Sequence, residues 1–130
     1  MNKVNVRIEA VVNPTEDKEK VATSIKNVFG DVNLEAVPFQ QGFILRGIGI
    51  GLEFLSPLKK GLERERIRDA AKAYLLRRIE GHRIVFHLDK QASYARRITF
   101  YIKGGSPLGP ITVIIESRDP LKVVEWLTKK

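Results

Sequence analysis

Alternation of apolar and polar residues along short segments constrains the fold of this chain more than any other feature. Between Val4 and Val12 every second residue is apolar, which is the period-2 pattern of a strand with one buried face. Similar apolar stretches predict five further strands, over 32–38, 43–48, 84–88, 98–102 and 111–115. Gln40-Gln41-Gly42 separates the second strand from the third and predicts a hairpin.

Helical signals interrupt these strands. Asn13-Pro14 can begin a helix that Gly30 ends. From Glu63 to Glu80 the apolar residues recur at helical spacing, and Gly81 is placed to stop a helix of about 27 Å. A helical turn is expected at 90–94, and a short last helix is expected after Asp119-Pro120, with Leu121, Val124 and Leu127 directed inward.

Short turns and helices of unequal length favour an α+β fold over a regular parallel alternation. We therefore predict a single domain over residues 1–130, with a mainly antiparallel sheet and helices packed on it. The chain is 43% apolar and has no cysteine, which excludes disulfides and thiolate nucleophiles. No stretch approaches the roughly 18 apolar residues of a membrane span, so we expect no membrane contact and a cytoplasmic location.

The sequence contains no recognisable catalytic constellation. Gly47-Ile48-Gly49-Ile50-Gly51 lacks the third glycine of a dinucleotide fingerprint and the Gly-Lys-Ser/Thr of a phosphate loop. These glycines are more typical of a bent strand end or a close backbone approach. His82 and His87 would point to opposite faces of one strand. We therefore expect no enzyme activity, no metal and no cofactor.

Positive charge is concentrated in the middle third of the chain. The segment from Lys59 to Lys103 has thirteen Lys and Arg residues against five Asp and Glu residues, which equals the formal net charge of +8 of the whole chain. Such a concentration favours a polyanion-binding surface. The alternative is a charge-rich, solvated helix.

Two surfaces could carry this charge. On the predicted long helix, basic residues recur every four positions and form one row, although neighbouring acids can pair with part of it. On the strands, Tyr101 alternates with cations, as in proteins that stack single-stranded bases on a ring; alternatively, helices cover this face and Tyr101 packs at the core edge. The candidate nucleic-acid-binding residues are Lys60, Arg64, Arg68, Lys72, Arg77, Arg78, Arg83, Arg96, Arg97, Tyr101 and Lys103.

Several segments together resemble a known family. They are Leu58 to Leu76, Lys90-Gln91-Ala92, Ser106-Pro107-Leu108-Gly109-Pro110-Ile111, and Asp119-Pro120 with Trp126-Leu127. This set is similar to a family of small archaeal proteins for which RNA binding is predicted. That family is in turn similar to a group of predicted exosome-associated subunits. The resemblance implies a fold like that of the ribosomal protein that contacts 5S RNA.

We expect a non-catalytic RNA-binding domain that uses a basic surface from the 59–103 segment. The alternative is a protein-interaction subunit of a larger assembly, in which the same surface meets an acidic partner. An enzyme acting on a phosphorylated small molecule is the weakest hypothesis because nucleophile, base and metal set are all lacking. A continuous basic surface would favour RNA, and an exposed apolar patch beside it would favour a protein partner.

Overall fold

One antiparallel sheet organises the molecule. The computed structural model describes residues 3–101 and 108–130, so the candidate residue Lys103 lies outside the described residues. Six strands form the sheet in the order β2-β3-β1-β6-β5-β4, and all pairs are antiparallel. Their bounds are β1 (Val4–Val12), β2 (Leu34–Phe39), β3 (Gly42–Ile50), β4 (Ile79–Glu80), β5 (Arg83–Asp89) and β6 (Pro110–Ser117).

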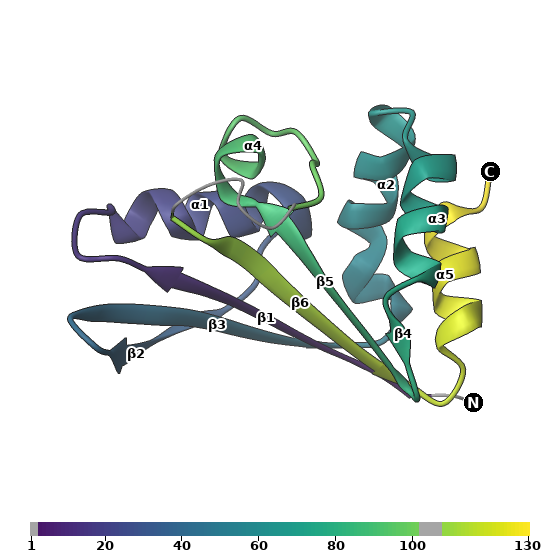
Figure 1. Cartoon of the computed structure of the whole chain (residues 1–130), viewed down its shortest axis with the longest axis horizontal. Helices are drawn as coiled ribbons and strands as arrows, with labels where there is room; N and C mark the ends of the chain where they lie inside the picture. The colour runs from purple at the N-terminus through teal and green to yellow at the C-terminus, as the bar shows by residue number, and fades with distance from the viewer. Residues whose placement is uncertain (1–2, 102–107) are drawn as a thin grey trace.

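Helices cover one face of this sheet and leave the other face open (Figure 1). They are α1 (Lys18–Phe29), α2 (Ser56–Arg64), α3 (Arg68–Leu76), α4 (Lys90–Tyr94) and α5 (Pro120–Thr128), with a short 3-10 helix η1 (Leu52–Leu55) before α2. Along β1 the apolar side chains predicted to face inward are buried and their neighbours are not. The α+β prediction is therefore confirmed.

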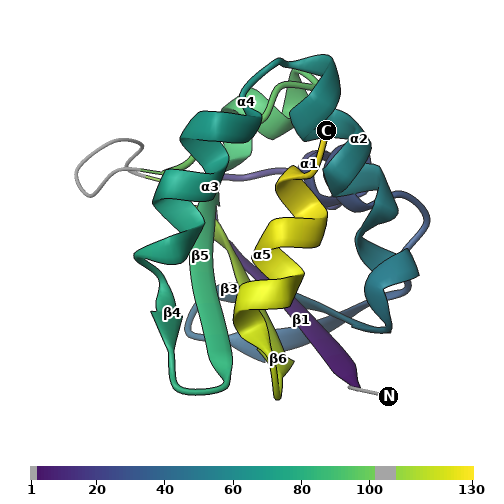
Figure 2. The same ribbon diagram turned by 90° about the vertical axis from the view of Figure 1, so that its right-hand side faces the viewer.

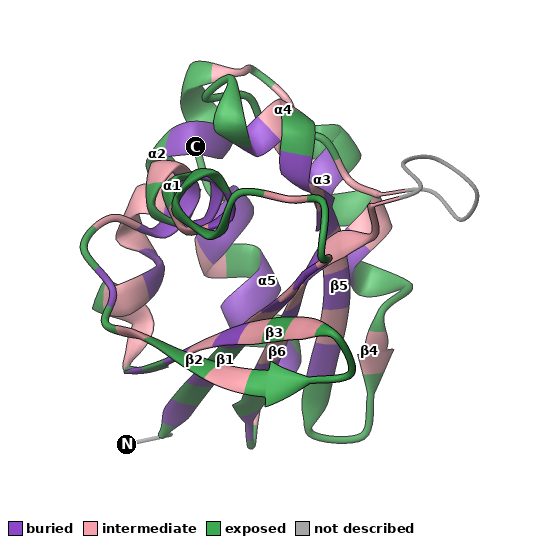
Figure 3. Cartoon of the chain, turned by 90° about the vertical axis from the view of Figure 1, so that its left-hand side faces the viewer, coloured by how far each residue is buried: buried purple, intermediate pink, exposed green. Residues whose placement is uncertain are grey.

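The hairpin of β2 and β3 is also confirmed, and much of β2 and its turn is exposed (Figure 3). At Gly49 a close approach explains the glycine, because a Cβ there would overlap the ring of Phe54. The prediction that these glycines mark close backbone approaches holds at this position.

Two helix boundaries differ from the prediction. Helix α1 begins at Lys18 because the Asp17 side chain accepts a hydrogen bond from the backbone N–H of Glu19. Asn13 does not cap this helix; its backbone N–H and side chain donate to Glu16 and close a separate turn. In α5 the Asp119 cap is confirmed, but Leu121 points outward and is 50% exposed, while Val124 and Leu127 are buried.

The predicted long helix over 63–80 is wrong, because the chain reverses in its middle. Helix α2 ends at Arg64, and Arg66 adopts the left-handed conformation with φ of 58°. Helix α3 then starts at Arg68 and packs beside α5. The reversal lets both short helices bury apolar side chains, Leu58 and Leu62 from α2 and Ala71 and Leu75 from α3.

The predicted strand over 98–102 is reduced to a bridge between Leu88 and Phe100 within the described residues. Two backbone hydrogen bonds flank the bridge, from Asp89 to Thr99 and from Tyr101 to His87, both of 2.9 Å. Residues 99–101 and β4 therefore cover different halves of the same edge of β5.

Candidate nucleic-acid interface

Two helices end in the same unusual way. After α2, the N–H of Arg66 donates to the carbonyl of Glu63, and the N–H of Ile67 donates to that of Leu62. After α4, Arg96 and Arg97 make the equivalent bonds to Ser93 and Ala92. Each pair of bonds is a Schellman motif, whose left-handed position is usually glycine. Here arginine occupies that position twice, with φ of 58° at Arg66 and 63° at Arg96.

Polar contacts hold these two turns against each other. The Glu65 carboxylate lies 3.8 Å from Nε of Arg97 and accepts a hydrogen bond of 3.4 Å from the N–H of Ile98. Arg64 donates to the carbonyl of Arg96 at 3.4 Å. Below them, Gly61 packs so closely on Ile98 that a Cβ would overlap it. Segments about thirty residues apart in sequence therefore form one surface.

We call this region the paired-turn surface and define it by five exposed cations: Lys60, Arg64, Arg66, Arg96 and Arg97. Two acids lie among them in sequence, Glu63 and Glu65, and the Glu65 carboxylate is close to Arg97. Sequence analysis selected four of the five cations. Arg66 is not among the candidates, and it lies outside the predicted row of basic residues spaced four apart.

The predicted row of four basic residues does not form, because α2 ends between its second and third members. Arg68 instead donates to the carbonyl of Lys129 at 3.4 Å. Lys72 lines a shallow hollow together with Trp126 and Lys129. The second half of the predicted row therefore lies against the C-terminal end of α5, which Figure 2 shows beside α2 and α3.

The remaining candidates lie toward the other end of α3 and along β5. Arg77 and Arg78 follow α3, and Arg83 begins β5. The Arg78 guanidinium lies 4.6 Å from the centre of the Tyr74 ring. Tyr101 is half-buried and sits opposite His87 through a backbone hydrogen bond. The structure therefore places Tyr101 opposite His87 in the backbone pairing, and its interleaving with cations stays a prediction.

His87 itself is in a restrained environment. Its Nδ1 lies 3.1 Å from the hydroxyl oxygen of Thr112, and its backbone N–H donates to the Tyr74 hydroxyl at 3.4 Å. Burial, with a smaller contribution from the charge of Arg78, lowers the pKa of His87 below its ordinary value of 6.5. The neutral imidazole is therefore favoured in the folded protein.

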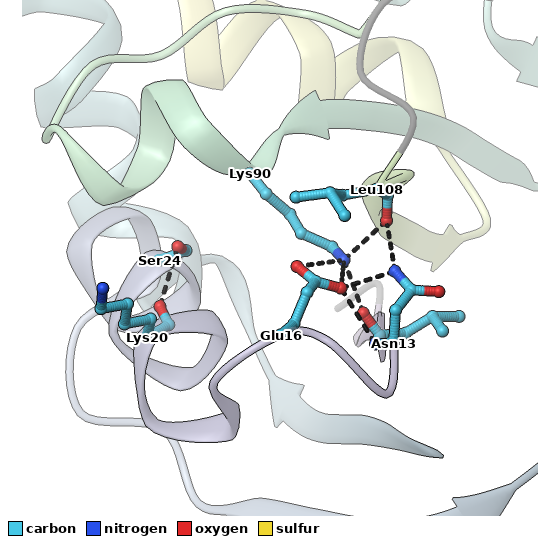
Figure 4. Close-up of polar contacts among 7 residues, drawn as sticks. Asn13, Glu16, Lys20, Ser24, Lys90 and Leu108 are labelled. Carbon is cyan, nitrogen blue, oxygen red and sulfur yellow. Dashed lines mark hydrogen bonds and ion pairs between the residues drawn. The ribbon is translucent and has the colours of Figure 1, made fainter. Parts of the chain in front are cut away.

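Lys90 belongs to the basic segment but contributes nothing to its surface. Its side chain is 4% exposed and its ammonium lies 3.0 Å from the Glu16 carboxylate (Figure 4). It also donates to the carbonyls of Val11 and of Leu108. Asn13 donates to the same carboxylate and to the Leu108 carbonyl, which completes a network that joins α4 and the end of β1 to the turn before α1 and the segment before β6.

A hollow of about 350 Å³ lies beside this network. All three ammonium protons of Lys90 have acceptors, so none is left for a ligand. Burial alone would raise the pKa of Glu16, but hydrogen bonds from Asn13 and Lys90 outweigh burial and hold that pKa below its ordinary value. We therefore interpret this network of Asn13, Glu16, Lys90 and Leu108 as structural and call it the clamp.

The open face of the sheet has a different character. Ile48 and Ile50 are 68% and 74% exposed on it. Its charges are partly balanced, since Glu9 lies 3.1 Å from Arg7 and 3.7 Å from Arg46. This face is mixed apolar and neutral rather than basic.

The described residues, 3–101 and 108–130, contain neither a cluster of metal ligands nor a helix that could span a membrane. No group of three or more His, Cys, Asp or Glu residues there could hold a metal ion. Among the helices formed by those residues, none is long and apolar enough to cross a membrane.

Comparison with known proteins identifies relatives across nearly the whole chain. A family model described as RNA binding matches residues 5–117. A UPF0201 protein of Sulfolobus acidocaldarius is 41% identical over 126 residues, which cover 96% of this chain and 87% of that protein. A UPF0201 protein of Thermococcus onnurineus is 36% identical over 125 residues, which cover 96% and 91%.

A solved structure agrees with these sequence matches. The crystal structure of a UPF0201 protein from Methanococcus jannaschii superimposes with a TM-score of 0.86 at 30% identity, covering 95% of this chain and 98% of that one. The chain therefore belongs to the UPF0201 family, and its residues 5–117 match the family model that is described as RNA binding.

Proposed function

We propose that this protein is a non-catalytic RNA-binding domain whose paired-turn surface contacts the phosphate backbone. The observation that carries the proposal is the double use of arginine at a left-handed Schellman position. An L-residue with a side chain in that conformation costs about 1–2 kcal/mol, and glycine would avoid this cost. Backbone strain of this kind accumulates where function requires a particular side chain.

The charge of the paired-turn surface supports the same proposal. Cations at helix C-termini also stabilise the helix dipole, but by about 0.3–1 kcal/mol each at exposed sites. That effect is available from Arg64 alone at the end of α2 and needs no left-handed arginine after it. Phosphate, in contrast, is recognised by clustered guanidinium groups that donate several hydrogen bonds each.

A second contact region is proposed beside the edge of β5 that β4 and residues 99–101 cover, near Arg77, Arg78, Arg83 and Tyr101. Tyr101 sits opposite His87, whose pKa is lowered, so the imidazole adds no charge near neutral pH. A base stacked on Tyr101 would contribute about 1–3 kcal/mol without altering the salt dependence of binding. Tyr101→Ala tests this contribution against Tyr94→Ala, an exposed tyrosine on α4.

The experiment for the paired-turn surface is a fluorescence anisotropy titration of labelled RNA. Arg64→Glu with Arg96→Glu should abolish most of the binding at low salt, because both changes place negative charge on this surface. The matched control is Lys20→Glu with Lys26→Glu, exposed cations of α1 that change the net charge equally. Equal losses in both double variants would mean that net charge alone governs binding, which refutes the assignment.

The open sheet face favours a second candidate function, a protein-interaction subunit. Exposed isoleucines between balanced charges are typical of protein interfaces, whereas nucleic-acid interfaces are strongly positive. Purification of the native protein with and without nuclease separates the two functions. Partners lost after nuclease treatment support RNA binding, and partners that remain until Ile48→Lys removes them support the protein interface.

A further inference from the structure

Trp126 lines a hollow in the helical layer. The hollow measures about 620 Å³ and lies where α3 and α5 pack together. Trp126, Glu125, Lys122 and Lys129 reach it from α5 and its C-terminal end, and Lys72 reaches it from α3. An indole ring therefore borders a space with three cations and one acid.

Two further cations near the ring already have structural partners. The Lys59 ammonium lies 5.2 Å from the centre of the Trp126 ring and donates to the carbonyls of Trp126 and Lys129 at 2.6 and 3.1 Å. Arg68 donates to the Lys129 carbonyl as well. Together they satisfy two carbonyls at the C-terminal end of α5, those of Trp126 and Lys129. Lys59 and Arg68 therefore position the ring and the terminal residues.

Within the described part of the chain, the ammonium groups of Lys72 and Lys129 have no such partners. Neither makes an ion pair within the residues that the structure describes. Lys122 lies 3.8 Å from the Asp119 carboxylate, but its side chain is 77% exposed. These cations remain available to an anion that enters the hollow.

A second hollow relates the Trp126 hollow to the paired-turn surface through neighbouring residues. A smaller hollow of about 200 Å³ is lined by Arg66, Arg68, Asp69 and Lys130. Arg66 belongs to the paired-turn surface, and Lys130 follows Lys129 of the Trp126 hollow. Cations of both hollows thus lie near the C-terminus, which Figure 2 shows at one end of the helical layer.

We propose that an unpaired base of single-stranded RNA stacks on Trp126 while Lys72 and Lys129 hold the phosphates beside it. The inference rests on the proposed RNA binding and specifies the form of RNA recognised. Aromatic rings bordered by cations bind single strands because the ring accepts any base and the cations follow the backbone. A duplex keeps its bases stacked on each other, so it cannot use the ring in this way.

Trp126 also provides the direct test, because it is the only tryptophan of the chain. Tryptophan emission should be quenched when an unlabelled ten-nucleotide oligouridylate binds. A duplex RNA of equal length and inorganic polyphosphate should bind in anisotropy competition without quenching. Quenching by polyphosphate to the same extent would refute stacking. Binding of the oligouridylate without quenching would also refute it and leave the proposed function intact. Absence of all RNA binding at low salt would refute both.

Variants sharpen the result. Trp126→Ala should weaken single-strand binding by about 5- to 150-fold, and Trp126→Phe, which keeps a ring, should recover most of the loss. Glu125→Gln should strengthen binding, because it removes the acid of the hollow. Leu121→Ala is the control on the exposed side of the same helix and should change nothing. If Trp126→Phe and Trp126→Ala, checked for equal folding by melting, lose affinity equally or not at all, the proposal is wrong.

Discussion

Replacing Arg66 by glycine should stabilise the protein and weaken RNA binding, two effects that a purely structural arginine could not combine. Arg66 has φ of 58°, and an L-residue with a side chain loses about 1–2 kcal/mol there. Glycine avoids that loss but costs about 0.5–1 kcal/mol in chain entropy. The net gain is therefore roughly 0–1.5 kcal/mol, which corresponds to a rise of up to several degrees in Tm.

Urea unfolding measures the first effect, and RNA titration at several salt concentrations measures the second. Loss of one phosphate contact should make the slope of log K against log salt shallower by about 0.7–0.9. Gly81 provides a reference because it has φ of 62° with nothing near its Cβ position. Gly81→Ala should cost a similar backbone energy with no effect on RNA. A destabilised Arg66→Gly variant would show that Arg66 is not strained, and a variant that binds RNA like the wild type would show that Arg66 does not contact phosphate.

Three other perturbations test the account of the structure. Lys90→Met should cost about 3–5 kcal/mol in urea unfolding because it leaves the Glu16 carboxylate buried without its partner; a loss below 1 kcal/mol would show that the clamp is not needed. Because the pKa of His87 is lowered when the chain folds, the unfolded chain binds the proton more tightly, so the free energy of unfolding should decrease as pH falls from 6.5 through the lower folded-state pKa. His87→Gln should lack that decrease, and an unchanged pH profile in this variant would contradict the assignment. Gly49→Ala should cost about 1–3 kcal/mol of unfolding free energy through overlap with Phe54. Phe54→Leu in the same chain should recover part of that loss, and no recovery would show that the overlap is not its cause.

Five of the six strands, all but β4, were predictable because a sheet with one buried face imposes an alternation of apolar and polar residues on each strand. Val4 to Val12 alternate regardless of what the rest of the chain does, and a six-stranded sheet with one covered face requires that alternation. No comparable sequence pattern marks the break between α2 and α3. The break occurs at an arginine, whereas the residues that predict a left-handed turn are glycine and asparagine.

The candidate site was predictable only in part, since charge counted along the chain ignores where the chain folds. Lys90 counted toward the basic segment, yet it is buried against Glu16, which is 74 residues away. Lys129 lay outside that segment and yet shares a hollow with Lys72. Neither contact has a local signal, because both depend on which helices the sheet brings together. The likeness to the ribosomal protein that contacts 5S RNA stays a prediction.

The salt dependence of single-stranded RNA binding tests directly whether the cations of the paired-turn surface contact phosphates. If the five cations of the paired-turn surface each contact a phosphate, log K should fall linearly with log salt with a slope of about −3 to −4. Arg64→Glu with Arg96→Glu should make that slope shallower by the contribution of about two phosphate contacts. Lys20→Glu with Lys26→Glu should leave the slope unchanged. Binding weaker than micromolar at low salt, or a slope that both double variants alter equally, would contradict the account and favour the protein-interaction subunit.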